Sequence, residues 1–208
     1  MSKISFVYFD VGGVGVIDFT ANNGRQEMLQ YIGVPRERAT EFNTLFDELE
    51  VQSSRGINID SFKQELVRKF NLILPKKFSF RTYLADHLVA NPSIWPVIEE
   101  VKARCKIGLL TDMYPGLLDN INERGLLPSI VWDVIIDSSV EKFQKPDQEL
   151  YVLAQAHTNM PAQKILFVDN LQQNLDPAVE MGWQTFLYDP KNPKQSSQDL
   201  LKFIDKNL

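Results

Sequence analysis

The sequence of 208 residues is poor in cysteine and histidine: it contains one cysteine, Cys105, and two histidines, His87 and His157. A single cysteine excludes an internal disulfide framework and a C-x-x-C metal or redox site. Two histidines do not make a zinc cluster, so we expect both to be structural. A chain of this length can bury roughly 70% of its unfolded surface, so an apolar core suffices to stabilise it.

Positive charge and long apolar runs are scarce as well. There are 22 Lys and Arg against 27 Asp and Glu, a formal net charge of −5. Proteins that bind nucleic acid or anionic membranes usually present a basic surface, so neither partner is expected. No run of about 18 uncharged apolar residues occurs, which predicts no membrane helix. The first ten residues lack a signal-peptide pattern, and we expect a cytoplasmic protein.

The apolar residues gather in five short runs, each of which we predict to be a buried strand. These runs cover residues 4–9, 106–110, 133–136, 164–168 and 184–188. Helical patterns follow them over residues 92–104, 117–124, 147–156 and 174–181. Strands that alternate with single helices predict an α/β fold, with a parallel sheet covered by helices on both faces. The polar stretch at 192–198 is expected to be a loop before a last helix.

Residues 19–90 interrupt this alternation, because they show no strand pattern. Apolar residues at helical spacing indicate four helical segments there, and Asp60 is expected to cap the third. We therefore predict two units: a core of residues 1–18 and 91–208, and an inserted all-helical cap of residues 19–90. Hinges between them are expected near 16–18 and at the Asn91-Pro92 pair.

Polar side chains follow three of the predicted strands at the point where each strand ends. These residues are Asp10, Thr111 and Asp169, and Lys145 can reach the same edge of the sheet from a loop. Three glycines come shortly after the first of them: Gly12, Gly13 and Gly15. Ligands in α/β sheets bind outside the carboxyl ends of the strands. Each residue alone is also explained as a cap, a turn or a solvated charge, but the joint pattern indicates a magnesium and phosphate site.

The order of these motifs resembles that of the haloacid dehalogenase-like hydrolases. The four motifs are FDVGGV at 9–14, LLTD at 109–112, KPD at 145–147, and VDN at 168–170 followed by Asn174. The segment at 48–66 resembles the helical cap of that family's first subclass. The resemblance implies a Rossmann-like core and, usually, magnesium-dependent phosphatase chemistry.

The resemblance also implies roles for the residues of the first and last motifs. Asp10 would be the catalytic nucleophile that takes the phosphoryl group. Magnesium would be held by Asp10, the backbone carbonyl of Gly12 and Asp169. Asn170 and Asn174 would support this metal site from a second layer, and Asn170 can hold a metal-bound water.

The two middle motifs would bind the phosphoryl group. Thr111 and the backbone amide of Asp112 would contact its oxygens. Lys145 would act both in binding and in catalysis, because its ammonium neutralises charge on the nucleophile and on the phosphate.

Gly12 and Asn170 depart from the family pattern. Phosphatases of this family normally carry aspartate, as general acid and base, where this chain has Gly12. The second acidic residue of the last motif is Asn170 here, and Asp112 stands where asparagine is common. Glycine keeps its carbonyl for a metal ion but supplies no proton, so we expect an activity that is weakened or restricted to certain substrates.

Three hypotheses for the function follow. The first is a magnesium-dependent phosphatase that acts on a small phosphorylated metabolite through an aspartyl phosphate, as a monomer or homodimer. The second is a haloacid dehalogenase, which uses the same nucleophile without a metal or an acid at Gly12. The third is a catalytically silent binding or regulatory protein, which the absence of that acid favours.

Overall fold

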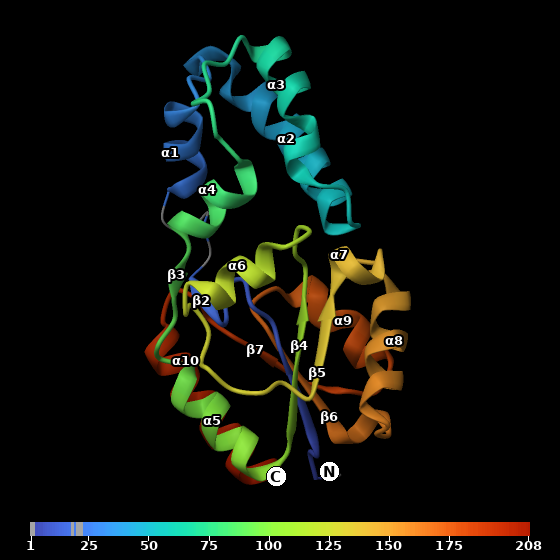
Figure 1. The fold of residues 1–208 in the computed structure, drawn as a ribbon. Coiled ribbons are helices and arrows are strands. Elements are labelled where there is room, and N and C mark those ends of the chain that lie inside the picture. Colours follow the sequence, from blue (N-terminus) through green and yellow to red (C-terminus); the bar gives the residue numbers. More distant parts are fainter. Residues whose placement is uncertain (1–2, 18, 20–22) are drawn as a thin grey trace.

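The computed structural model describes residues 3–17, 19 and 23–208. Its centre is a five-stranded parallel sheet in the order β5-β4-β1-β6-β7 (Figure 1). The strands are β1 (Phe6–Phe9), β4 (Lys106–Thr111), β5 (Val134–Asp137), β6 (Ile165–Asp169) and β7 (Gln184–Leu187). All five predicted strands are present, with ends shifted by one or two residues. The predicted α/β fold with a parallel sheet is therefore confirmed.

Helices cover both faces of the sheet, and the side chains of β1 show why. Phe6 and Tyr8 lie in one apolar cluster, whereas Val7 and Phe9 lie in the other, as alternation along a strand requires. The first cluster contains residues of α8 (Gln148–Thr158) and α9 (Gln172–Glu180). The second contains residues of α5 (Trp95–Arg104), α6 (Leu117–Glu123) and α10 (Pro193–Asn207). Each face of the sheet is thus closed by its own helices.

Two details of the core differ from the predictions. The loop expected at 192–198 is wrong, because α10 already begins at Pro193. A proline in the first turn of a helix has no N–H that needs a partner, so it favours this early start. The short helix α7 (Ser138–Glu141) has no counterpart in the predictions.

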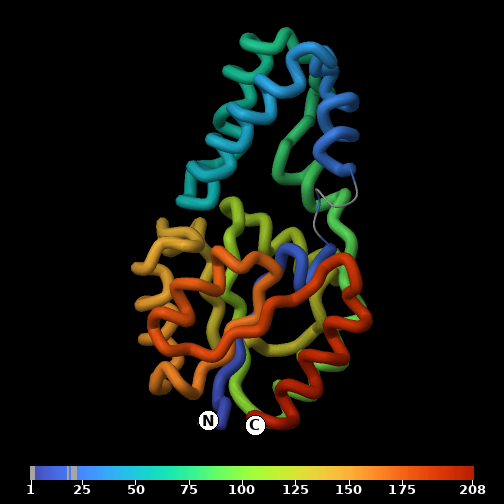
Figure 2. Tube along the Cα trace, turned by 180° about the vertical axis from the view of Figure 1, so that it is seen from behind, coloured from blue at the N-terminus to red at the C-terminus, as the bar shows by residue number. Residues whose placement is uncertain are grey.

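The helices between β1 and α5 form a helical insertion beyond the carboxyl ends of the strands (Figures 1 and 2). They are α1 (Gly24–Tyr31), α2 (Ala39–Ser54), α3 (Lys63–Phe70) and α4 (Phe80–His87), with the 3-10 turns η2 (Arg36–Arg38) and η3 (Ile59–Phe62). The insertion joins the core through an antiparallel ribbon of β2 (Val16–Ile17) and β3 (Val89–Ala90). Strand β3 was not predicted, but it lies outside the central sheet. Of the first predicted hinge, Asp18 lies outside the described residues.

Asp60 is not the N-cap that the sequence predicts. Asn58 caps the turn η3 instead, because its side-chain oxygen accepts from the Asp60 backbone N at 3.0 Å. The Asp60 carboxylate accepts from Ser79 Oγ at 2.6 Å and from Phe80 N at 2.7 Å. Asp60 therefore fixes the start of α4 rather than the start of α3.

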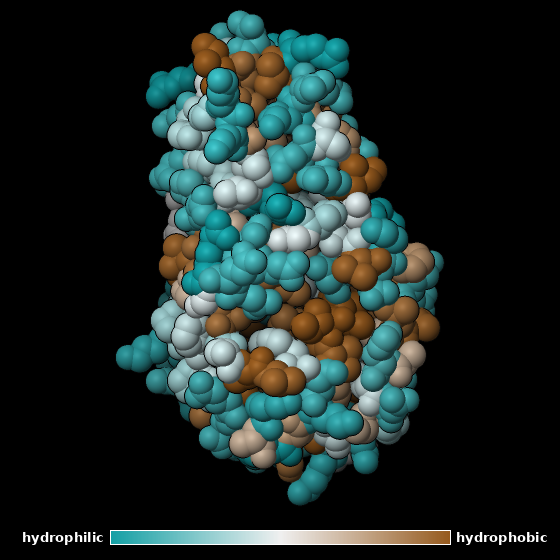
Figure 3. Space-filling view, in the orientation of Figure 1, coloured by the Kyte–Doolittle hydropathy of each residue, from teal (hydrophilic) through white to brown (hydrophobic). Residues whose placement is uncertain are grey.

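The face of the core seen in Figure 3 has both hydrophilic and apolar areas. One apolar area lies where β5 and α7 are drawn in Figure 1, and Ile135 and Val140 are 45% and 67% exposed there. Strand β5 is an outer strand of the sheet. Within the described part of the chain, no helix has both the length and the apolar character to cross a bilayer.

Candidate active site

Asp10, Lys145 and Asp169 meet at the carboxyl edge of the sheet. Asp10 follows β1, and its backbone N donates to Val168 O of the neighbouring strand β6 at 2.9 Å. The Lys145 ammonium lies 2.9 Å from Asp10 Oδ1 and 2.7 Å from Asp169 Oδ2. All three side chains are buried, with residue exposures of 6%, 5% and 0% in the order Asp10, Lys145, Asp169. The sequence predicts that these residues converge, and in the structure Lys145 contacts both carboxylates.

Asp169 is held by more partners than Lys145 alone. Asn174 Nδ2 donates to both of its oxygens at 3.1 Å, and the backbone N of Leu171 donates to Oδ1 at 2.8 Å. Tyr151 donates its hydroxyl to the Asn174 carbonyl at 2.6 Å, which anchors the first turn of α9. Both Asp169 oxygens thus accept hydrogen bonds, and the Lys145 ammonium is held between Asp169 and Asp10.

The glycine loop after β1 folds back tightly. Val16 N donates to Val11 O, and Gly13 N donates to Val16 O, both at 2.8 Å. Gly13 has a φ of +76°, and a Cβ there would lie 2.5 Å from the side chain of Asn170. The amide of Asn170 therefore packs directly on this loop. A Cβ at Gly12 would meet nothing within 4 Å, so the space for a larger side chain is present.

Asp112 and Thr111 flank the cluster from the end of β4. Asp112 Oδ1 accepts from the backbone N of Lys145 at 3.0 Å. The prediction for Asp112 concerned its backbone amide and did not include this side-chain contact. Thr111 is fully buried, and its Oγ1 has no hydrogen-bond partner among the described residues. An unsatisfied buried hydroxyl costs free energy, so this site favours an added hydrogen-bonding group such as a phosphoryl oxygen.

The cluster carries more negative than positive charge. Three carboxylates, those of Asp10, Asp112 and Asp169, surround the single ammonium of Lys145. Burial raises the pKa of Asp10 to about 7, although Lys145 acts in the opposite direction. Burial likewise raises the pKa of Asp112. Burial alone would lower the pKa of Lys145, but the nearby carboxylates outweigh it, so that its pKa is raised and it stays charged.

The chemistry of these groups fits a magnesium ion. With all four groups ionised the formal charge is −2, which a divalent cation would balance. Magnesium prefers oxygen ligands and keeps several waters. Asp10, the Gly12 carbonyl and Asn170 supply oxygens of the right kind around the glycine loop. Among the described residues no three His, Cys, Asp or Glu side chains form a metal-binding group, so backbone, amide and water oxygens would complete the site.

A cleft of about 240 Å³ opens beside this cluster. Gly12 and Asp112 line it from the core, and Arg25 and Glu50 line it from the helical insertion. No motif in the sequence marks Arg25 or Glu50, because their partners lie far away along the chain. Only the folded structure brings them to the site.

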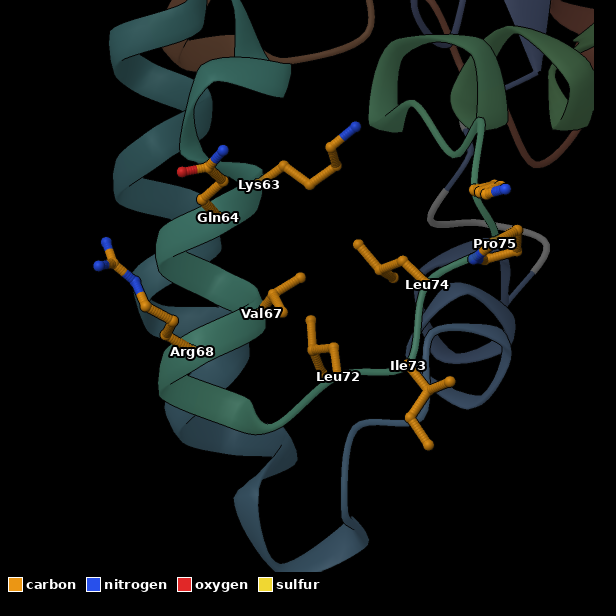
Figure 4. A pocket seen from close by; sticks show the side chains of 9 residues that line it. Lys63, Gln64, Val67, Arg68, Leu72, Ile73, Leu74 and Pro75 are labelled. Atoms are coloured by element: carbon orange, nitrogen blue, oxygen red, sulfur yellow. The ribbon is translucent and has the colours of Figure 1, made fainter.

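A wider groove of about 610 Å³ lies elsewhere, between α3 and the segment 72–76 of the insertion. Figure 4 shows Val67, Leu72 and Leu74 facing one another across it, with Arg68 pointing away. None of the predicted site residues lines this groove. Its size alone therefore does not make it the active site.

The solved structures that are similar to this chain share one fold. No protein-family model matches the sequence, and no curated protein matches it either. Solved structures do match, among them a HAD family enzyme from Bacteroides thetaiotaomicron in complex with magnesium and inorganic phosphate. It is 16% identical with a TM-score of 0.71, over 89% of this chain and 94% of that chain.

Two further matches have different descriptions. A predicted HAD-like family hydrolase from Porphyromonas gingivalis is 20% identical with a TM-score of 0.73, over 97% of this chain and 99% of that one. The L-2-haloacid dehalogenase from Xanthobacter autotrophicus, with chloropropionic acid covalently bound, is 17% identical with a TM-score of 0.63, over 89% and 77%. This chain has the HAD-like hydrolase fold.

The HAD-like fold accounts for the position of the cluster. In this chain the cluster of Asp10, Lys145 and Asp169 lies at the carboxyl edge of the parallel sheet, where such folds bind ligands. The helical insertion follows directly after the glycine loop and reaches over this edge (Figure 1). The arrangement gives one buried cluster, an adjacent cleft and side chains from both parts of the chain.

Proposed function

We propose that this protein is a magnesium-dependent phosphatase of the HAD-like superfamily, in its first subclass, that acts on a small phosphorylated metabolite. The observation that carries the proposal is the group of three carboxylates around the buried Lys145 ammonium, beside a buried Thr111 hydroxyl that has no hydrogen-bond partner among the described residues. Such a group suits a divalent cation and a phosphoryl group together. Residues 1–18 and 91–208 form the catalytic core in this proposal, and residues 19–90 form a cap.

In the proposed first step, a carboxylate oxygen of Asp10 attacks phosphorus and forms an aspartyl phosphate while the bond to the leaving oxygen breaks. Lys145 holds the Asp10 carboxylate and neutralises its charge. Thr111 donates its hydroxyl to a phosphoryl oxygen. Magnesium, when bound, supplies positive charge next to the transferring oxygens.

The second step is attack of water on the aspartyl phosphate, which releases inorganic phosphate and restores Asp10. Gly12 offers no carboxylate to activate this water or to protonate the leaving oxygen in the first step. The leaving oxygen must therefore depart as a stable anion or take its proton from solvent or substrate. This requirement restricts the substrates that react quickly.

The test is release of phosphate from a panel of phosphorylated metabolites, with magnesium and with a chelator. Turnover that needs magnesium and is lost in Asp10→Asn supports the proposal. Turnover that persists unchanged in Asp10→Asn, or in the chelator, contradicts it.

Haloacid hydrolysis is the second candidate, because one observation favours it. Both oxygens of Asp169 accept hydrogen bonds from Lys145, Asn174 and Leu171, an arrangement that is complete without a cation. A dehalogenase needs the same aspartate nucleophile but no metal. Halide release from 2-haloacids in the presence of a chelator would establish this activity instead. Binding without any turnover would point to a binding or regulatory protein.

A further inference from the structure

The cleft beside Asp10 has mostly apolar walls. Its lining includes Leu84 and Leu88 from the insertion side and Leu117 and Ile121 of α6 from the core. Among the described residues, its charged or ionisable lining is limited to Arg25, Glu50, Asp112 and Tyr114. A leaving group that extends from a phosphate at Asp10 would therefore pass along apolar side chains toward Arg25 and Glu50.

The Arg25 side chain is held in place, but not all of its hydrogen-bond donors have an acceptor. Its Nη2 lies 2.5 Å from Glu50 Oε2 and 3.3 Å from Asp47 Oδ1, and its guanidinium lies 4.7 Å above the centre of the Phe46 ring. Tyr114 of the core donates its hydroxyl to the other Glu50 oxygen. Arg25 Nη1 is buried and has no hydrogen-bond partner among the described residues. This nitrogen has donors to offer to a ligand that reaches it.

The charge of Arg25 is already balanced. Two carboxylates, Glu50 and Asp47, stand against its single guanidinium, and the Glu50 side chain is only 26% exposed. A further carboxylate or phosphate at this end would meet no surplus positive charge and would lie close to Glu50. A neutral acceptor would satisfy the nitrogen without that repulsion.

We propose that this cleft binds the leaving group of the substrate, and that this group is small, largely apolar and uncharged, with one carbonyl or hydroxyl oxygen that accepts from Arg25 Nη1. The inference rests on the proposed phosphatase function and adds the class of substrate to it. Arg25 is then a specificity-determining residue supplied by the insertion, and Glu50 selects against leaving groups that carry a further anionic substituent at their far end.

The size of the cleft limits the leaving group further. A dry cavity of about 150 Å³ accommodates benzene. The cleft of about 240 Å³ therefore has room for one ring with a short substituent, or an aliphatic group of similar bulk. Larger groups would extend beyond the cleft.

Three aryl phosphates of similar size test the inference: 4-acetylphenyl phosphate, 4-methylphenyl phosphate and 4-carboxyphenyl phosphate. At the 4-position of the ring, the acetyl ester carries a neutral hydrogen-bond acceptor, the methyl ester carries none, and the carboxy ester carries an anion. Each ester is compared between the wild type and Arg25→Met, so that intrinsic differences in reactivity cancel. Arg68→Met is the matched control, because Arg68 also belongs to the insertion but is not among the residues that line the cleft.

In Arg25→Met, kcat/KM for the acetyl ester relative to the methyl ester is expected to fall about 10- to 100-fold. The ratio is expected to stay unchanged in Arg68→Met. In Glu50→Gln, kcat/KM for the carboxy ester relative to the acetyl ester is expected to rise about tenfold. Ratios that do not change in Arg25→Met, or a wild type that prefers the carboxy ester, overturn the inference.

Binding of the free leaving groups separates this inference from the proposed function. Calorimetry of 4-hydroxyacetophenone and 4-methylphenol requires no turnover. Tighter binding of the ketone that is lost in Arg25→Met supports the assignment of the cleft, even if no phosphate ester is hydrolysed. Equal binding of both phenols to the wild type overturns it, even if the esters are hydrolysed. Circular dichroism of each variant verifies its fold.

Discussion

At Gly12 the chain has the space for a general acid but not the side chain. A positioned general acid typically contributes about 10²- to 10⁴-fold in rate, and only when the leaving oxygen needs a proton. An alkyl alcohol needs that proton, whereas a nitrophenolate or a carboxylate leaves without it. We expect the wild type to hydrolyse aryl and acyl phosphates faster than simple sugar phosphates.

Gly12→Asp tests this explanation, because a Cβ at this position meets nothing within 4 Å. We expect the steady-state rate of this variant to rise for both an alkyl and an aryl phosphate, and to rise more for the alkyl ester. The increase for the alkyl ester should lie in the range of about 10²- to 10⁴-fold. Gly13→Asp is the control, since its Cβ would lie 2.5 Å from Asn170 and φ is +76°. Equal efficiency of the wild type on both esters would show that another residue already acts as the acid.

The raised pKa of Asp10 makes the stability of the metal-free protein depend on pH. The folded-state pKa is about 7, above the usual value of about 3.9 for an unfolded chain, so the folded protein binds the proton more tightly. This contribution to the free energy of unfolding is present at low pH and is lost as pH rises from about 4 to 7, by up to about 1.4 kcal/mol per pH unit.

Denaturant unfolding at pH 5 and pH 7.5, in a chelator, measures this effect. We expect Asp10→Asn to show a smaller loss of stability between the two pH values than the wild type, because its amide does not titrate. An identical pH dependence in both proteins would mean that Asp10 is ionised in the folded state throughout this range.

Among the elements, the end of α2 makes a close contact between the insertion and the core. Arg55 Nη2 lies 2.7 Å from Asp147 Oδ2, and Asp147 also accepts from the backbone N of Gln144. Gly56 has a φ of +98°, and a Cβ there would lie 2.6 Å from Ser139 O. This contact therefore rests on the loop that carries Lys145.

Gly56→Ala is expected to lift the end of α2 from this loop and lower kcat/KM for an aryl phosphate at least about tenfold, because precise placement of catalytic groups controls the rate. Gly33→Ala is a matched control: φ is +79° there, but a Cβ meets nothing within 4 Å. Both variants carry similar backbone strain, so a larger drop in Tm for Gly56→Ala than for Gly33→Ala measures the loss of this contact. Equal losses of kcat/KM in the two would contradict a role for the contact.

The sequence could predict the strands and the residues at their ends, but not the side-chain contacts between distant parts of the chain. Buried strands such as β4 were evident, since a continuous apolar run is enough to identify them. Asp60 was misassigned, because its partner Ser79 lies 19 residues away and belongs to another helix. Arg25 and Tyr114 were missed for the same reason: each binds Glu50, and such contacts depend on how two parts of the chain come together. Motifs at strand ends could be predicted because a parallel sheet aligns those ends.

For the whole molecule, magnesium should act as a stabilising ligand. A cation that binds only the folded state at 100 times its Kd adds about 2.7 kcal/mol, which corresponds to an increase in Tm of about 5–10 °C for a domain of this size. We expect thermal melting to show this increase in the wild type. It should be reduced in Asn170→Ala, which removes an oxygen beside the glycine loop.

Asn174→Ala is the comparison for this measurement, because Asn174 contacts Asp169 rather than the glycine loop. We expect this variant to keep most of the magnesium-dependent increase in Tm. The opposite order, with Asn170→Ala unaffected and Asn174→Ala insensitive to magnesium, would show that Asp169 and not Asn170 holds the cation.

The ribbon of β2 and β3 makes the insertion modular. Both ends of the insertion leave the core side by side, with Ile17 paired to Val89 and Val16 paired to Ala90. A two-residue Asn-Gly turn from Ile17 to Val89 would convert the ribbon into a β-hairpin and leave every connection of the five-stranded sheet unchanged. By the same geometry, a different insertion could be grafted between these two residues, so that the walls that the insertion gives to the cleft could be exchanged without rebuilding the carboxyl edge of the sheet.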